Sequence, residues 1–156
     1  MEKDNDNSWN VEDKDSVELF LDAARFGDLS LVVDLYSQYS NKRVLEGRDE
    51  FQNTPLHLAS GNGHLEVVKF LVSQGAIVNA LNDAGNTPLH WAALLGELQV
   101  VEYLLSQGAD PCIHNEFQRT PLDEALGKGH TSVVSVLEKV LESQGKTDTS
   151  WLKEDT

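Results

Sequence analysis

Residues 54–59 read Thr-Pro-Leu-His-Leu-Ala, and two close copies of this hexapeptide follow at a fixed interval. The copies are Thr-Pro-Leu-His-Trp-Ala at 87–92 and Thr-Pro-Leu-Asp-Glu-Ala at 120–125, so the pattern returns every 33 residues. A degenerate fourth copy precedes them, because 23–29 aligns with 59–65 at an offset of 36 residues. A period of this length is typical of proteins in which similar units stack in one row.

Each unit contains the signals of two short helices. A threonine stands at the N-cap position, where its hydroxyl can accept a backbone N–H, and the proline after it suits the first helical turn. A glycine such as Gly63 ends this helix and supplies a left-handed backbone conformation. In the second helix Leu65, Val68 and Leu71 recur at helical spacing before Gly75 closes it. Since no unit can bury its apolar residues alone, we expect the units to stack.

The motifs Thr-Pro-Leu-His-x-Ala, Gly-His-x-x-Val-Val and Leu-Leu-x-x-Gly-Ala resemble those of the ankyrin repeat, and the resemblance covers about 16–145. It implies an all-α ankyrin-repeat solenoid of four stacked helix-turn-helix repeats, of which the first and last are degenerate caps. It also implies a concave surface formed by the turn tips and the first helices. The predicted repeats span 16–48, 49–81, 82–114 and 115–145.

Five positions in the loops and in the first helix of each unit show where the chain agrees with the family pattern and where it differs. His57 and His90 occupy the family position at which an imidazole ties adjacent loops together, and Asp123 replaces that histidine in the last unit. Gln52 and Gln118 stand where the family consensus has glycine. These substitutions are departures from the family pattern, and the first and last units have the character of caps.

Two polar segments flank the repeats. Residues 1–15 predict an acidic flexible tail, in which Trp9 is the side chain expected to dock on the first repeat. Residues 146–156 predict a short C-terminal tail. Trp151 and Leu152 in that second tail either cap the last helix or contact a partner.

Acidic residues dominate the charge of the chain. Its 156 residues include 26 acidic and 12 basic ones, which give a formal net charge of −14. Such a surface repels nucleic-acid phosphates and attracts cationic proteins. The expected partner is therefore another protein of basic character, and nucleic acid is not expected to bind. The alternative is that the charge serves solubility alone.

Composition also suggests a compartment. No apolar run approaches the roughly 20 residues that cross a bilayer, and the acidic start lacks the apolar segment of a secretory signal. The single cysteine, Cys112, agrees with a reducing environment. We therefore expect a monomer of the cytoplasm and nucleus that does not associate with membranes.

Motifs for catalysis or cofactor binding are not recognisable. Four of the five histidines fall at repeat-equivalent positions, which stacked helices would hold about 10 Å apart. Residues 61–63, Gly-Asn-Gly, lack the further glycine and the Lys-Ser/Thr pair of a phosphate-binding loop. We expect a non-catalytic protein with no cofactor and no bound metal.

The candidate site is the concave surface, where large apolar side chains alternate with acidic ones. Exposed aromatic anchors with a charged rim describe a protein-binding site. The alternative is that the two leucines pack under the neighbouring turn and the turn phenylalanines fold back over the tips. The predicted partner-binding residues are Arg25, Phe26, Glu50, Phe51, Asn53, Asp83, Asn86, Leu94, Leu95, Glu116, Phe117 and Arg119.

Three stretches, at 21–29, 85–96 and 109–117, further resemble the small fungal ankyrin-repeat chaperones that escort a newly made, basic small-subunit ribosomal protein to the nucleus. This resemblance implies a chaperone or adaptor whose acidic groove shields a basic client from nucleic acid and from aggregation. The alternative is a regulator that binds and occludes a kinase or a transcription factor.

Overall fold

The computed structural model describes residues 11–39 and 42–146, and these residues form helices and loops without a strand. The three predicted Thr-Pro signals each begin a helix, and a second helix follows each of them. The elements are α1 (Val11–Phe26), α2 (Leu29–Tyr39), α3 (Lys42–Leu45), α4 (Pro55–Gly61), α5 (Leu65–Ser73), α6 (Pro88–Leu95), α7 (Leu98–Ser106), α8 (Pro121–Lys128) and α9 (Thr131–Ser143).

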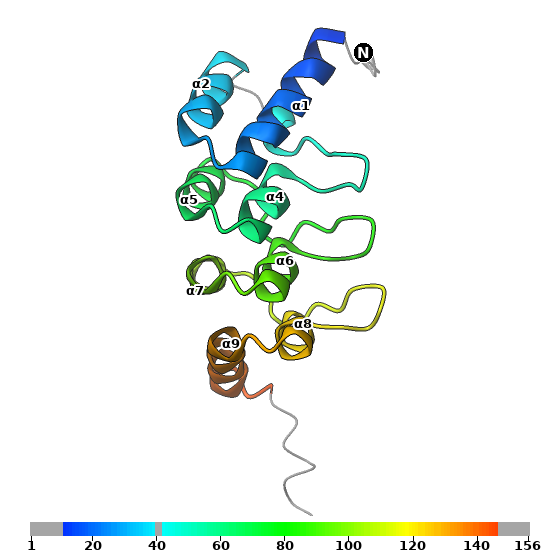
Figure 1. The fold of residues 1–156 in the computed structure, drawn as a ribbon, viewed down its shortest axis with the longest axis vertical. Coiled ribbons are helices and arrows are strands. Elements are labelled where there is room, and N and C mark those ends of the chain that lie inside the picture. Colours follow the sequence, from blue (N-terminus) through cyan, green and yellow to red (C-terminus); the bar gives the residue numbers. More distant parts are fainter. Residues whose placement is uncertain (1–10, 40–41, 147–156) are drawn as a thin grey trace, which may run out of the picture.

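The helices stack in two columns, as Figure 1 shows. One column contains α1, α4, α6 and α8, and the other contains α2, α5, α7 and α9. Long loops project sideways from the first column, one from each junction between repeats (Figure 1). This arrangement confirms the predicted all-α solenoid of four stacked helix pairs.

The first helix begins earlier than the sequence suggested. Helix α1 starts at Val11, inside the segment 1–15 that we assigned to a flexible tail, so that boundary was wrong. The short helix α3 also had no counterpart among the predicted elements. The side chains of Trp9, Trp151 and Leu152 lie outside the described residues, and their predicted roles stay predictions.

Each Thr-Pro signal forms a reciprocal cap. The backbone N–H of His57 donates to the hydroxyl of Thr54 at 3.3 Å, and the N–H of Thr54 donates to the imidazole of His57 at 3.1 Å. Thr87 and Thr120 form the same capping box. Two backbone N–H groups are therefore satisfied at the start of α4, α6 and α8, which fixes where each helix begins.

The core is continuous along the stack, because each helix pair buries its apolar face against the next. Leu56, Leu71 and Leu104 are fully buried members of it. Trp91 packs on Gly61, since a Cβ atom added to that glycine would lie 2.8 Å from the indole. The tryptophan therefore lies between α4 and α6.

Candidate protein-binding surface

Two buried histidines hold consecutive loops in register. The Nδ1 atom of His57 accepts the N–H of Thr54, so its proton lies on Nε2, which donates to the carbonyl oxygen of Asn86 at 2.8 Å. His90 repeats this link, with Nε2 3.0 Å from the carbonyl oxygen of Arg119. Burial lowers the pKa of His57 to about 4, and burial also lowers the pKa of His90. Both are neutral links between loops, as the family resemblance implied.

A ladder of side-chain amides ties the same loops together. The Nδ2 group of Asn82 donates to Oδ1 of Asn53 at 2.9 Å, and that of Asn115 donates to Oδ1 of Asn86 at 2.9 Å. This ladder had no counterpart among the features predicted from the sequence. Its signal was the recurrence of an Asp or Asn side chain at Asp49, Asn82 and Asn115, one period apart.

Two residues predicted to bind a partner belong to this ladder. Asn53 is buried, and its backbone N–H donates to the Asp49 carboxylate at 2.8 Å. The prediction that Asn53 projects into the groove is therefore wrong, because a buried amide with satisfied hydrogen bonds stabilises the loop. Asn86 is half-buried, and its side-chain oxygen already accepts the bond from Asn115.

Two further histidines form hydrogen bonds to the C-terminal ends of α1 and α6, which belong to the first column of helices, called the inner helices below. The Nε2 atom of His64 lies 2.9 Å from the carbonyl oxygen of Arg25, and that of His130 lies 3.0 Å from the carbonyl oxygen of Leu94. Glu97 stands at the equivalent position in the unit between them. The side chains that flank these carbonyl groups are thus presented from an anchored backbone.

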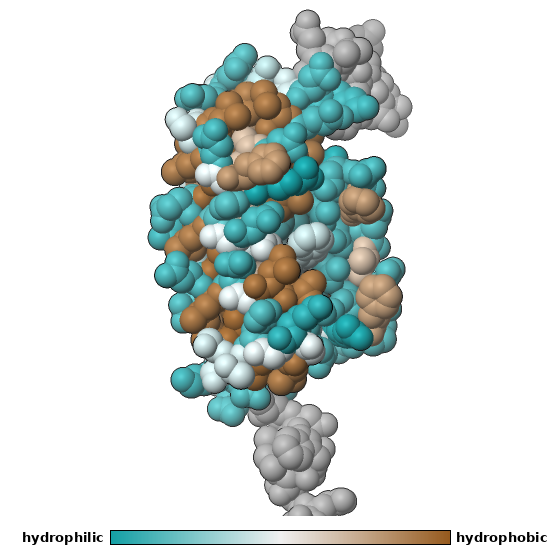
Figure 2. Space-filling model, viewed as in Figure 1, coloured by the Kyte–Doolittle hydropathy of each residue, from teal (hydrophilic) through white to brown (hydrophobic). Residues whose placement is uncertain are grey.

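The turn tips present aromatic and acidic side chains to solvent. Phe51 is 62% exposed and Phe117 is 66% exposed, which contradicts the alternative in which they fold back over the tips. Phe51, Ala84 and Phe117 are equivalent positions in the three loops. The acidic residue before each of them is also exposed, namely Glu50, Asp83 and Glu116. In the space-filling view, light brown atoms lie among teal ones along the edge formed by the loops (Figure 2).

The ends of the inner helices add a second group of apolar side chains. Phe26 is 73% exposed at the end of α1, and Leu95 is 47% exposed at the end of α6. Leu94 is half-buried, so it is less exposed than its neighbour Leu95. The helix ends and the turn tips therefore both present large apolar side chains to solvent.

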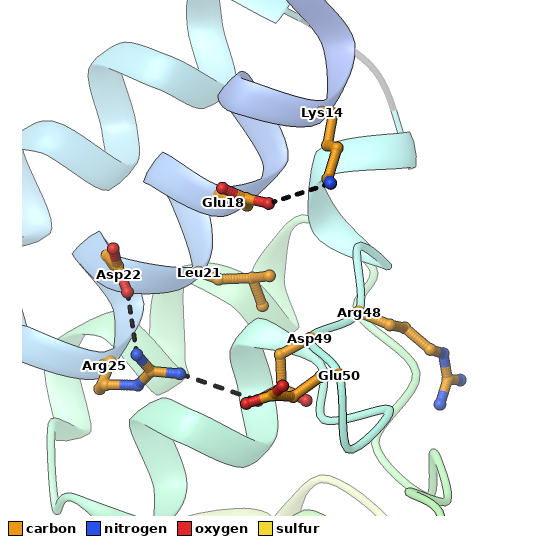
Figure 3. Close-up of a pocket in the computed structure, with 8 residues that line it drawn as sticks. All are labelled: Lys14, Glu18, Leu21, Asp22, Arg25, Arg48, Asp49 and Glu50. Atoms are coloured by element: carbon orange, nitrogen blue, oxygen red, sulfur yellow. Dashed lines mark hydrogen bonds and ion pairs between the residues drawn. The ribbon is translucent and has the colours of Figure 1, made fainter. Parts of the chain in front are cut away.

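The predicted basic residues of the groove already have acidic partners. Arg25 lies 3.0 Å from Asp22 and 3.7 Å from Asp49, and it joins α1 to the first loop (Figure 3). Arg119 is exposed and lies 3.8 Å from Glu124. Such pairs neutralise the two guanidinium groups locally.

A hollow of about 580 Å³ opens at the α1 end of this surface. Figure 3 shows acidic side chains from α1 and from the first loop around it. Its lining includes no serine, cysteine or histidine among the described residues. The lining residues are Lys14, Glu18, Leu21, Asp22, Arg25, Arg48, Asp49 and Glu50.

Within 11–39 and 42–146 no group of three or more His, Cys, Asp or Glu side chains could hold a metal ion. Among the same residues no helix has the length and apolar character to cross a bilayer.

Comparisons with known proteins give relatives that share parts of the repeat region. Alpha-latrocrustotoxin-Lt1a of Latrodectus tredecimguttatus is 43% identical over 61 residues, which is 39% of this chain and 4% of the toxin. Ankyrin repeat domain-containing protein 49 of Bos taurus is 42% identical over 69 residues, 44% of this chain and 28% of that protein. The human transient receptor potential cation channel subfamily A member 1 is 40% identical over 55 residues, 35% of this chain and 5% of the channel.

The chain thus matches at most 28% of the length of these three relatives. None of the three is named as a ribosomal-protein chaperone, so the finer resemblance has no support from them. The family model described as Ankyrin repeats (3 copies) matches residues 20–115, which is more than half of the 156 residues. The chain belongs to the ankyrin-repeat family.

Proposed function

We propose that this chain is a non-catalytic chaperone or adaptor that binds a basic client protein on its concave surface and keeps it soluble. Membership of the ankyrin-repeat family supports a protein-binding module, since these repeats are typically not catalytic. The family alone does not identify the client, because a few surface side chains select the partner on a shared scaffold.

The observation that carries the proposal is the pairing of aromatic and acidic residues at equivalent places in the loops. Phe51 and Phe117 are exposed, and each follows a carboxylate directly. Large exposed aromatic side chains serve as anchors in protein interfaces, and a rim of one charge selects the opposite charge in a partner. The net charge of −14 makes that partner basic.

A newly made small-subunit ribosomal protein is the client class that fits these features. Such proteins are basic and bind nucleic acid, so an acidic surface competes with phosphates for the same cationic side chains. Apolar contacts to the tips would hold the client after the charges have brought it close. This role places the protein in the cytoplasm and the nucleus, acting as a monomer.

The test uses the total protein extracted from small ribosomal subunits as the probe. The immobilised chain should retain basic proteins from this mixture at physiological ionic strength and reduce their light scattering in solution. The double variant Phe51→Ala/Phe117→Ala should weaken this binding by about 2 kcal/mol or more. Its melting temperature should hardly change, because both side chains are exposed.

Ile77→Ala provides the matched control, since Ile77 is an exposed apolar residue that is not at a turn tip. This variant should retain the same proteins as the unaltered chain. Failure of the unaltered chain to retain any basic protein would contradict the proposal. Capture of a neutral folded kinase or transcription-factor domain instead would favour the occluding regulator.

A further inference from the structure

The turn tips form a regular row along the stack. Each of the three loops carries an exposed carboxylate at the same place in the repeat, Glu50, Asp83 and Glu116. The next residue is Phe51 in the first loop and Phe117 in the third, and both are exposed. None of these carboxylates takes part in the ion pairs found among the described residues. Their charge is therefore available to a partner.

Backbone hydrogen bonds join each tip to the next one. The N–H of Asp83 donates to the carbonyl oxygen of Phe51 at 3.1 Å, and the N–H of Glu116 donates to that of Ala84 at 3.0 Å. The tips are therefore fixed to each other directly, in addition to the histidine and amide links deeper in the loops. A row with such links presents its carboxylates at a constant spacing.

Two independent estimates give that spacing. From Glu50 to Asp83 the path crosses one peptide unit of about 3.8 Å and one backbone hydrogen bond, across which Cα atoms lie about 5.5 Å apart, so the two Cα atoms are about 9 Å apart when this path is straight. The inner helices that carry the loops pack at about 8–10 Å. The Cα atoms that carry consecutive carboxylates are thus about 8–10 Å apart, and the row of Cα atoms spans about 16–20 Å.

This spacing selects the backbone of a linear ligand. In a polyproline II segment every third side chain points the same way, with about 9.3 Å between them. A β-strand repeats a face about every 6.7 Å, which fails to match. An α-helix presents every seventh residue at about 10.5 Å, and over two intervals that distance of about 21 Å exceeds the row.

We infer that the client segment bound at the tips is an extended, polyproline-II-like stretch with a basic residue at every third position. Its three basic side chains pair with Glu50, Asp83 and Glu116. Apolar residues six positions apart, next to the first and third basic ones, pack on Phe51 and Phe117. This inference rests on the proposed function and specifies the ligand of the same surface.

Fluorescence anisotropy with labelled synthetic peptides tests the register, which is the placing of a basic residue at every third position of the ligand. The matched peptide is Lys-Leu-Pro-Lys-Pro-Pro-Lys-Leu, used together with its reverse sequence because the row does not fix the chain direction. The control, Lys-Leu-Lys-Pro-Lys-Leu-Pro-Pro, has the same composition with lysines at every second position. One of the two matched peptides should bind about tenfold more tightly than the control at low ionic strength.

Two triple variants, each of which removes three negative charges, test whether the carboxylates at the tips cause this preference. Glu50→Gln/Asp83→Asn/Glu116→Gln should remove the tenfold preference for the matched peptide. Glu102→Gln/Glu138→Gln/Glu142→Gln removes three exposed carboxylates from the outer helices and should keep the preference. Ala84→Phe adds an aromatic side chain at the middle tip and should tighten binding several-fold, since it completes the aromatic row.

The outcomes separate this inference from the proposed function. Equal affinity for the matched and control peptides, with both weakened by the tip variant, would overturn the register and leave the function standing. Tighter binding of a helical peptide with lysines at every seventh position would overturn the extended ligand in the same way. If neither the peptides nor the ribosomal-protein mixture binds, the proposed function fails as well.

Discussion

The imidazole of His57 joins two repeats through a single hydrogen bond, because its Nε2 atom lies 2.8 Å from the carbonyl oxygen of Asn86. Its other ring nitrogen accepts the N–H of Thr54 at the start of α4. One neutral side chain thereby satisfies a helix cap and positions the next loop. The exposed tips depend on such links, since loops have few apolar contacts of their own.

Replacing His57 by alanine should lower the free energy of unfolding by about 3 kcal/mol. The change leaves the buried Thr54 N–H without a partner, removes one of the two hydrogen bonds that the Asn86 carbonyl oxygen accepts, and opens a cavity. Asp123→Ala is the matched control, because Asp123 is exposed, caps its helix in the same way and bridges no further repeat. It should cost about 1 kcal/mol. Urea denaturation of both variants measures the difference, and equal losses would contradict the linking role.

Acid should destabilise the protein through the same histidine. The pKa of His57 is about 4 in the folded state and near 6.5 in the unfolded chain, so the unfolded state binds the proton more strongly. The stabilisation is complete above pH 6.5 and is lost as the pH falls from 6.5 toward 4. Between pH 7 and pH 5 the loss should be on the order of 2 kcal/mol.

The variant His57→Gln serves as the reference for this titration. It should be less stable at pH 7, yet its free energy of unfolding should fall less between pH 7 and pH 5. Carboxylates and other histidines contribute equally to both proteins, so the difference between the two curves isolates His57. Parallel curves would show that His57 titrates normally in the folded protein.

Glycine should stabilise the protein at two loop positions. Gln52 and Gln118 have φ angles of 61° and 58°, and Gly85 has 71° at the equivalent place. Non-glycine residues in this left-handed region cost about 1–2 kcal/mol, which glycine avoids at the expense of a more flexible unfolded chain. Gln52→Gly and Gln118→Gly should each raise the free energy of unfolding by about 0.5–1 kcal/mol.

Gly85→Ala should act in the opposite direction. Its Cβ atom would lie 3.3 Å from the Cα atom of Asn115 and 3.3 Å from the backbone nitrogen of Glu116, where backbone atoms have little freedom to move. Thermal melts of the three variants measure both the expected gain and the expected loss of stability. A loss of stability in the two glycine variants would mean that the glutamine side chains make contacts that offset the strain.

The last helix should be essential for stability. Val133 and Leu137 of α9 are buried, and α9 packs on α7 and α8. Deleting Thr131–Leu141 should unfold or aggregate the chain, because the apolar face of the preceding repeat would meet water. Circular dichroism decides it: an unchanged cooperative melt would mean that the last repeat is dispensable.

A single substitution in α9 tests the contribution of that helix to stability without removing it. Leu137→Ala should lower the free energy of unfolding by about 2–5 kcal/mol, since the side chain is fully buried. Leu126→Ala, at an exposed position on α8, should cost less than about 1 kcal/mol. Similar costs for both would place Leu137 outside the core.

Sequence alone could predict the number of repeats and the start of each inner helix. The Thr-Pro pairs, the turn glycines and the 33-residue period are local signals, and a local signal acts on the backbone next to it. The boundary at 16 was wrong because the start of α1 carries no comparable signal, and helix ends depend on tertiary contacts.

The exposure of individual loop residues depended on the tertiary structure. Asn53 and Phe51 are two positions apart in one polar loop, yet the asparagine is buried and the phenylalanine is exposed. The asparagine finds its hydrogen-bond partner, Asn82, on the next repeat, and only stacking brings that partner within 2.9 Å. The repeat period determined which residues are equivalent. The contacts between repeats decided which of them remain free to meet a partner, because burying a polar group is costly unless a neighbour forms a hydrogen bond to it.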